Sequence, residues 1–409
     1  EYMDPFLHTY LSGFRKGHSC QDLLLRMTED WREALDKGLS IGLIAIDLSK
    51  AFDCMPHGLL LAKLSAYGFS EDSCRLMKSY IMEREQRVKI GETVSDWICN
   101  IKGVPQGSIL GPLLFNIFIN DFLNVKFNSK VYNYADDNTL CCVDSDIEAL
   151  KCKLQLDCLQ SMDWFKKNSM KANASKFQLM FLSRNHDFMG ESIAINDNII
   201  DSTRSIDILG VELDNKLKLN LHVDQVCSQA GKQVNALKRI KQYLDKAGKM
   251  TIYNSYINSV FSYCSLIWML TNKTNLEKLE RTNKRAIRFV TSKGHLDYET
   301  ICKQENQLNI YRRCVKSAAV TMYKVSNKLA PRYVYELFTK NEIQYEMRDN
   351  ERFSLPKYKT VQYGKQSIRY FGAKLWNNIP VAIKNSPSLS TFKSGIDKWL
   401  LNCNISEIS

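Results

Sequence analysis

The chain has 409 residues, a formal net charge of +12 and thirteen cysteines. This length can bury large cores and suggests two or three domains. The charge is unevenly placed, since residues 1–150 carry a net charge of −6 and the remaining residues a net charge of +18. Clustered bases are typical of proteins that bind nucleic acid, although an ordinary solvated basic surface gives the same count.

Composition also argues against several classes of protein. The cysteines are scattered, with no Cys-x₂-Cys pair and no zinc-knuckle spacing. No signal peptide is visible, and the apolar run 260–270 is too short to span a bilayer. We therefore predict an intracellular protein in a reducing compartment, neither secreted nor membrane-bound. The run 260–270 is interpreted as the inner face of a core helix.

Hydrophobic periodicity predicts strands mixed with helices in the first half of the chain and mainly helices in the second. The predicted elements are a helix over 21–37, a strand over 43–47, a helix over 57–67 that Gly68 ends, a helix over 113–122, strands over 130–133 and 139–143, a helix over 147–167, and strands over 176–183 and 205–213. From about residue 221 the pattern is helical, without an internal repeat or low-complexity tract. Cys141 and Cys142 are expected on opposite sides of their strand.

Two neighbouring carboxylates, Asp136 and Asp137, fall between the predicted strands 130–133 and 139–143. This context predicts a hairpin that presents both groups at its tip. Such close like charges repel unless a cation lies beside them, and Mg²⁺ prefers carboxylate oxygens together with substrate phosphates. A bare Asp-Asp pair is more often a solvated turn. A third carboxylate, Asp47, ends the buried strand 43–47, where its ordinary role would be to cap the next helix.

Other segments of the chain also carry motifs. Phe52-Asp53 lies just beyond Asp47, and the loop 103–112, punctuated by glycine and proline, leads into the apolar helix 113–122. The stretch 278–288 is basic and helical, and could contact a phosphate backbone or be a plain solvated face.

Together these motifs resemble the palm of a reverse transcriptase of the non-LTR (LINE-type) retrotransposon branch. The residues that carry the resemblance are Leu11-Ser12-Gly13-Phe14-Arg15-Lys16-Gly17-His18-Ser19, Asp47-Leu48-Ser49-Lys50-Ala51-Phe52-Asp53, Pro105-Gln106-Gly107-Ser108-Ile109-Leu110-Gly111-Pro112, Tyr134-Ala135-Asp136-Asp137, Ile208-Leu209-Gly210-Val211 with His222, and Leu375-Trp376-Asn377-Asn378-Ile379-Pro380 with Phe392-Lys393. Several motifs in the correct order are far more specific than any one of them, and they cover nearly the whole chain.

The resemblance implies an α+β fold: a right-hand polymerase palm, with an antiparallel sheet and helices, partial fingers, and a mainly helical thumb and C-terminal region. The expected domains are residual fingers over 1–38, the palm with the catalytic carboxylates over 39–203, a thumb-like helical region over 204–300, and a basic helical region over 301–409. The implied activity is RNA-directed DNA polymerisation, a nucleotidyl transfer onto a primer 3′-hydroxyl.

The same resemblance assigns the metal ligands. Asp47 and Asp136 are the expected principal ligands of two Mg²⁺ ions, with Mn²⁺ as the alternative, and Asp137 is expected to have a weaker role because neighbouring side chains at a strand end cannot all point one way. The implied partners are an RNA template, a DNA primer and deoxynucleoside triphosphates, with no membrane. The implied location is the nucleus, for integration into DNA, or an RNA-bound particle in the cytoplasm.

Five residues resemble the family's nucleotide contacts. Phe52 matches the sugar gate, a ring that clashes with a ribose 2′-hydroxyl, and its alternative role is a core aromatic. Gln106 and Gly107 match the contact with template and nucleotide. Arg15 is a candidate triphosphate ligand or an ordinary surface residue. Lys176 matches a lysine beside the pyrophosphate, where it could donate a proton or be purely structural.

Two departures from the family lead to further expectations. The chain begins just before the fingers motif, so upstream fingers and an endonuclease domain of an intact element are expected to be missing, and no C-terminal Cys/His cluster is present. We expect Phe6, Leu7, Tyr10 and Phe14 to lack packing partners, and primer extension by a truncated or decayed copy to be weak.

Alternative functions also stay open. They are a non-enzymatic remnant that binds nucleic acid, an RNA-templated RNA polymerase and a group II intron maturase. Phe52 argues against ribonucleotide use, and the segment Trp376-Asn377-Asn378 argues against the maturase.

Overall fold

The computed structural model describes residues 2–340 and 352–403. It forms two compact units, each made of two stretches of chain. Unit 1 contains residues 1–18 and 39–204, and unit 2 contains residues 19–38 and 205–409.

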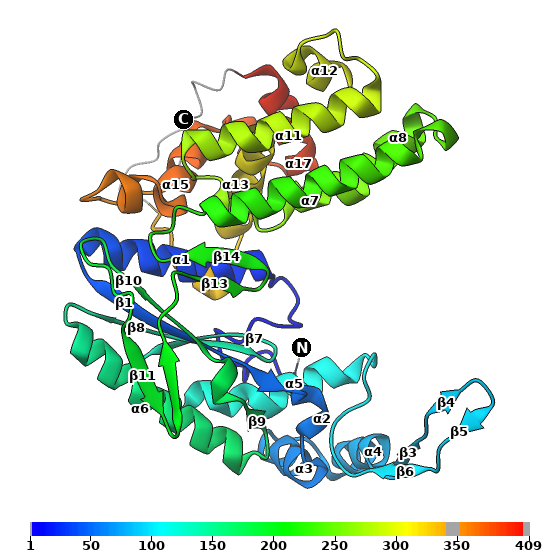
Figure 1. The fold of residues 1–409 in the computed structure, drawn as a ribbon, viewed down its shortest axis with the longest axis vertical. Helices are drawn as coiled ribbons and strands as arrows, with labels where there is room; N and C mark the ends of the chain where they lie inside the picture. The colour runs from blue at the N-terminus through cyan, green and yellow to red at the C-terminus, as the bar shows by residue number, and fades with distance from the viewer. Residues whose placement is uncertain (1, 341–351, 404–409) are drawn as a thin grey trace. The chain divides into compact units, whose positions relative to one another are not determined.

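A four-stranded antiparallel sheet forms the centre of unit 1, with strand order β10-β1-β8-β7 (Figure 1). Its strands are β1 (Ser40–Ile46), β7 (Lys130–Tyr134), β8 (Asp137–Asp144) and β10 (Gln178–Leu182). The smaller strands form two-stranded pairs: β2 (Leu48–Ser49) with β9 (Lys171–Ala172), β3 (Arg84–Gln86) with β6 (Ile98–Asn100), β4 (Lys89–Ile90) with β5 (Thr93–Val94), and β11 (Ser192–Ile195) with β12 (Asn198–Asp201).

The helices of unit 1 complete its core. They are α2 (Ala51–Cys54), α3 (His57–Ala66), α4 (Glu71–Ile81), α5 (Leu110–Ile119), η1 (Asn120–Asn124), α6 (Ile147–Lys167) and η2 (Ala174–Lys176). Gly42 of β1 permits α6 to approach closely, because a Cβ there would lie 2.6 Å from Leu154 Cδ1. Phe122 and Phe165 stack with their ring centroids 4.9 Å apart, which joins η1 to α6.

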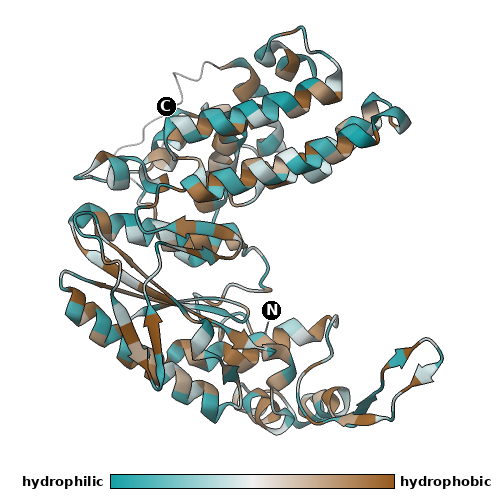
Figure 2. Ribbon diagram, viewed as in Figure 1, coloured by the Kyte–Doolittle hydropathy of each residue, from teal (hydrophilic) through white to brown (hydrophobic). Residues whose placement is uncertain are grey.

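Unit 2 is mainly helical. Its elements are α1 (Cys20–Lys37), the hairpin β13 (Ser205–Ile208) and β14 (Val211–Asp214), α7 (Asn220–Arg239), η3 (Lys241–Tyr243), α8 (Lys246–Ile252), the π-helix η4 (Tyr253–Ile257), α9 (Asn258–Ser262), α10 (Ser265–Trp268), α11 (Lys273–Thr291), α12 (Tyr298–Gln304), α13 (Ile310–Ser326), α14 (Arg332–Tyr335), the π-helix η5 (Val361–Lys365), α15 (Ile368–Asn378), α16 (Val381–Lys384) and α17 (Leu389–Asn402). Hydrophobic and hydrophilic residues alternate along α7 and α11 in Figure 2, as expected for helices with one buried face.

The first helix belongs to unit 2 through buried polar contacts. The Glu29 carboxylate accepts the backbone N–H groups of Ile368 and Arg369 at 2.8 and 2.9 Å, and so caps the start of α15. Asp36 accepts the N–H groups of Lys359 and Thr360 at 2.9 and 2.6 Å. The expected domain boundaries after residues 38, 203 and 300 stay a prediction, because the compact units are not domains defined by function.

Most of the predicted elements are confirmed, and the α+β class with an antiparallel sheet is correct. The helix over 147–167 has the same bounds in the structure, and Gly68, at φ +83°, follows the end of α3. Cys141 and Cys142 are both buried.

Two predictions about the second half of the chain were wrong. The strand expected over 205–213 is the hairpin β13–β14, since Leu209 and Gly210 have φ values of 52° and 74° and turn the chain back. The run 260–270 is not one helix, because Cys264, at φ 45°, interrupts it between α9 and α10.

The expectation that the N-terminal apolar residues lack partners was also wrong. Leu7 is buried, and the ring of Phe6 lies 5.6 Å from that of Tyr2. The Tyr10 ring meets Tyr132 edge-on at 6.0 Å. The segment also pairs with the sheet, since Leu11 forms a parallel bridge with residue 133 of β7.

Candidate polymerase active site

The three candidate carboxylates lie where β1 and the β7–β8 hairpin end together. Ile46, the last residue of β1, pairs with Asn138 of β8. Asp47 directly follows Ile46, so it lies near Asp137, the residue that begins β8. Tyr134 pairs with Asp137 and closes a two-residue turn, which leaves Asp136 in the turn itself. The strand register thus places all three carboxylates at the same end of the sheet, and their role as metal ligands stays a prediction.

The turn that holds Asp136 has a strained backbone. Ala135 has φ 56°, a region that residues other than glycine rarely adopt, and it is buried. Its carbonyl accepts the Asn133 amide at 2.7 Å, and the Asp136 carbonyl accepts the Asn138 amide at 3.0 Å. Since Asn133 and Asn138 also bond to each other at 2.9 Å, a buried amide network fixes the turn.

The segment before residue 18 supports this turn from behind. A Cβ added to Gly13 would lie 2.4 Å from the Ala135 nitrogen, so only glycine fits at this position. Asn116 of α5 donates to the Gly13 carbonyl at 2.7 Å, and the Ser12 N–H donates to the Asn133 carbonyl at 3.1 Å. Sequence reasoning did not find Asn116, whose role depends on a contact between distant segments.

Asp47 lies beside a lysine. The Lys176 ammonium nitrogen is 3.6 Å from an Asp47 carboxylate oxygen, and both side chains are about half exposed. The backbone also joins the two segments, since the Asn173 N–H donates to the Asp47 carbonyl at 3.4 Å and β2 pairs with β9. The structure therefore brings Lys176 next to Asp47, and its role beside the pyrophosphate stays a prediction.

The donor set fits a divalent cation shared with a substrate. Among residues 2–340 and 352–403, no three His, Cys, Asp or Glu side chains form a cluster that could hold a metal ion by themselves. Mg²⁺ does not require such a cage, because it is usually bound by one or two carboxylates together with substrate phosphates and water. Asp47 and Asp136 are partly accessible, and Asp137 is exposed, so their oxygen atoms can be reached from solvent.

Phe52 makes core contacts, and its role as a sugar gate stays a prediction. Its ring stacks on Phe115 of α5, with centroids 4.3 Å apart and planes 21° apart, and Phe14 meets it edge-on at 5.9 Å. The side chain is only half-buried, so one part of the ring remains accessible to solvent. The contacts make Phe52 a rigidly held aromatic.

Gln106 is held by an acid that sequence reasoning passed over. Its amide Nε2 donates to both carboxylate oxygens of Asp53, at 2.9 and 3.1 Å, which leaves its side-chain carbonyl available as an acceptor. Gly107, at φ 75°, is exposed with no atom near an added Cβ. The feature of the sequence that could have pointed to Asp53 is its position directly after Phe52.

A close backbone contact at Gly103 also anchors the loop 103–112. A Cβ on Gly103 would lie 2.8 Å from the Asp53 Cα, and the Gly103 carbonyl bonds with the His57 ring at 2.8 Å. Arg84 donates to the same carbonyl at 3.3 Å. These contacts tie the loop 103–112 to the start of α3.

Arg15 was predicted as a site residue, and its contacts in the structure are with the backbone of its own segment. Its guanidinium donates to the backbone carbonyls of His8 and Leu11 at 3.0 and 3.1 Å. Burial, followed by the charge of Arg15, lowers the pKa of His18 to about 4, so this histidine is neutral near pH 7. Arg15 therefore organises the N-terminal turn, and its role as a triphosphate ligand stays a prediction.

A family model described as "Reverse transcriptase (RNA-dependent DNA polymerase)" matches residues 1–213, more than half of the chain. The chain belongs to the reverse transcriptase family. Its relatives include RNA-directed DNA polymerases of transposons and mobile elements.

Two curated Drosophila melanogaster proteins illustrate the similarity. The "Probable RNA-directed DNA polymerase from transposon BS" is 27% identical over 294 residues, which cover 68% of this reverse transcriptase and 32% of the relative. The "RNA-directed DNA polymerase from mobile element jockey" is 26% identical over 293 residues, covering 68% and 31%. The chain thus spans about a third of the length of these relatives.

Among solved structures, a telomerase from Candida tropicalis in complex with a TWJ fragment of telomeric RNA aligns with a TM-score of 0.42 and 14% identity. The alignment covers 97% of this reverse transcriptase and 53% of the telomerase chain. Within residues 2–340 and 352–403, no helix is both long and apolar enough to cross a membrane.

Proposed function

We propose that this reverse transcriptase extends a DNA primer along an RNA template, with deoxynucleoside triphosphates as substrates. The observation that carries the proposal is the meeting of Asp47 with the Asp136–Asp137 turn at one sheet edge. In the reaction, the primer 3′-oxygen bonds to the α-phosphorus while the bond to the leaving pyrophosphate breaks. The 3′-hydroxyl loses its proton, and the pyrophosphate gains one.

Asp47 and Asp136 are the residues that would hold Mg²⁺ or Mn²⁺, with Asp137 in a supporting role. Two bound ions would lower the pKa of the 3′-hydroxyl and neutralise charge on the phosphates. The strained, hydrogen-bonded turn supports this assignment, since a carboxylate held in one place needs no rearrangement when substrate arrives.

The chain's own side chains have three further proposed tasks. Lys176, 3.6 Å from Asp47, would donate a proton to the leaving pyrophosphate. Phe52, fixed against Phe115, would lie under the sugar and reject a 2′-hydroxyl. Gln106, with its amide nitrogen held by Asp53, would present its carbonyl to the template–nucleotide pair.

A primer-extension assay tests the proposal with Asp136→Asn beside the parent chain. The substitution keeps the size of the side chain and removes its charge, so extension of a DNA primer on an RNA template should fall by at least about a thousandfold. Asp163→Asn, on the exposed surface of α6, is the matched control and should extend at the parental rate. Binding of primer–template should be nearly the same in all three proteins.

Two results would overturn the assignment. Extension by Asp136→Asn within about tenfold of the parent would remove the carboxylate from the chemistry. A parent chain that binds primer–template with Mg²⁺ present but extends nothing would favour a non-enzymatic nucleic-acid-binding role.

A further inference from the structure

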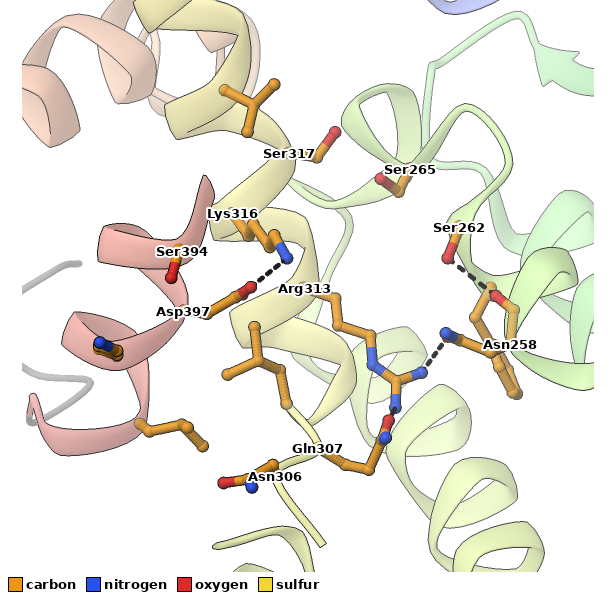
Figure 3. Close-up of a pocket in the computed structure, with 15 residues that line it drawn as sticks. Asn258, Ser262, Ser265, Asn306, Gln307, Arg313, Lys316, Ser317, Ser394 and Asp397 are labelled. Atoms are coloured by element: carbon orange, nitrogen blue, oxygen red, sulfur yellow. Dashed lines mark hydrogen bonds and ion pairs between the residues drawn. The ribbon is translucent and has the colours of Figure 1, made fainter. Parts of the chain in front are cut away.

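A cavity of about 790 Å³ lies in unit 2, whereas the three carboxylates belong to unit 1. Its walls come from α9, α13, α17 and the loop that precedes α13 (Figure 3). Ligand pockets in proteins commonly have volumes of about 300–1,000 Å³. The cavity is therefore large enough for a nucleotide.

The cavity is electropositive. Arg313 and Lys316 lie three residues apart on α13, so both project from one face of that helix, and Lys398 joins them from α17. The carboxylate that lines the cavity belongs to Asp397, and it is paired with Lys316 at 2.6 Å. Three cations against one carboxylate leave a net charge of +2, which favours an anionic ligand.

Arg313 is held in place by neutral groups. Its guanidinium donates to Asn258 and Gln307, as Figure 3 shows, and to the Tyr253 hydroxyl at 2.7 Å. Its described hydrogen bonds therefore go to neutral oxygen atoms, and the charge nearby that interacts with it is the partly buried Glu280 carboxylate, which does not line the cavity. Tyr253 begins the π-helix η4, and π-helical turns often occur at functional sites.

A buried hydrogen-bond chain fixes this arrangement. The Tyr253 hydroxyl donates to Asn283 at 2.7 Å, and the Asn283 amide donates to Tyr298 at 2.6 Å. Tyr298 in turn donates to the Glu280 carboxylate at 2.9 Å. Since Asn283 and Tyr253 are fully buried, the guanidinium of Arg313 is preorganised by the helical core.

Amide and apolar side chains complete the lining. Asn306 and Gln307 offer both donors and acceptors, which suits the polar edge of a base. Phe261 and Leu308 also line the cavity, but both are buried, so the apolar surface that they offer is small. Aromatic or apolar surface combined with cations and amides is the pattern by which proteins hold unpaired nucleotides.

We propose that this cavity binds one nucleotide of a single-stranded nucleic acid. The phosphate would lie against Arg313, Lys316 and Lys398, and the base against the accessible amides of Asn306 and Gln307. The cavity residues belong to unit 2, and the polymerase centre proposed above belongs to unit 1. The cavity would therefore be a second site at which the chain contacts an unpaired strand.

The test measures the binding of fluorescein-labelled pentanucleotides to the full chain by anisotropy, without divalent ions or nucleoside triphosphates. Arg313→Gln should weaken binding about tenfold or more, and Lys398→Gln severalfold. Lys303→Gln, which removes an exposed cation from α12 outside the cavity, should bind within about twofold of the parent. Lys398 is exposed, so its variant reports on binding even if Arg313→Gln loses stability.

RNA and DNA pentanucleotides of the same sequence are tested side by side, and a preference for either identifies the strand that the cavity holds. Photo-crosslinking of a 4-thiouridine-containing RNA should label peptides that contain Asn306 and Gln307. Parental affinity in both cavity variants, or crosslinks confined to other peptides, would overturn the proposal. Equal competition by inorganic phosphate would overturn the base contact. Primer extension plays no part in these readouts, so their outcome is independent of the polymerase assay.

Discussion

Gly13 lies directly behind Ala135, and a Cβ on Gly13 would be 2.4 Å from the Ala135 backbone nitrogen. Ala135 has the strained φ of 56° and precedes the carboxylate of Asp136. The N-terminal segment and the carboxylate-bearing turn are thus packed without room for one methyl group. The position of Asp136 depends on a residue from a distant part of the sequence.

Gly13→Ala is expected to displace the turn, because backbone atoms rather than a flexible side chain must move. A small shift of a reacting group can cost about a hundredfold in rate, so primer extension should fall by about 10- to 100-fold. Gly58→Ala in α3 is the matched control, since an added Cβ meets no atom within 4 Å there. Parental extension rates in Gly13→Ala would show that the turn tolerates the shift.

Phe52→Val should relax the choice of sugar, because it shortens the ring that is held against Phe115. Ribonucleotide incorporation relative to deoxynucleotide incorporation should rise by at least about tenfold, measured as the ratio of kcat/KM values. The loss of the stack should also lower stability by about 1–3 kcal/mol. Phe127→Val, which removes an edge-on contact with Phe122 at 5.4 Å, should cost similar stability and leave sugar choice unchanged. An unchanged ratio in Phe52→Val would make Phe52 a core aromatic only.

The basic helix α11 provides the charge test. Arg281 and Arg285 are exposed and four residues apart, so they lie on one face of the helix. Replacing both with Gln should make the plot of log affinity for primer–template against log salt less steep by about two units, because each phosphate contact releases counterions. Lys151→Gln with Lys153→Gln is the control, since Glu191 and Asp144 already pair with those lysines. An unchanged slope would make the α11 face an ordinary solvated surface.

His18 gives a pH dependence whose sign can be worked out. Its pKa is about 4 in the folded chain, lowered mainly by burial, against an ordinary value of 6.5. Between these values the unfolded chain binds the proton more readily, so stability falls as pH falls from about 6.5 to 4 and levels off below. The thermal midpoint should follow this course, and His18→Gln should reduce the fall. His295→Gln, at an exposed position, should leave it unchanged.

Much of the fold and of the site was predictable because it depends on local chemistry. Apolar runs indicated β1, β7 and β8, and so located Asp47 after one strand and Asp136 in the turn between the other two. Their role as metal ligands came from the resemblance and stays a prediction. Helix α6 was predicted with its correct bounds because its caps and apolar spacing are encoded within the helix itself. Lys176 was placed near the site only by resemblance, since residue spacing cannot show a contact with Asp47.

The tertiary structure decided the rest, because those features arise from contacts between distant segments. Packing of Gly13 against Ala135 and of Asp53 against Gln106 joins residues that no local pattern connects. The break at Cys264 and the hairpin turn at Leu209 require positive φ at residues other than glycine, which propensity disfavours and only surrounding packing can hold. The sequence by itself therefore determined the family and the order of the main elements, and it indicated the candidate carboxylates. Long-range packing determined which backbone supports them and which side chains surround them.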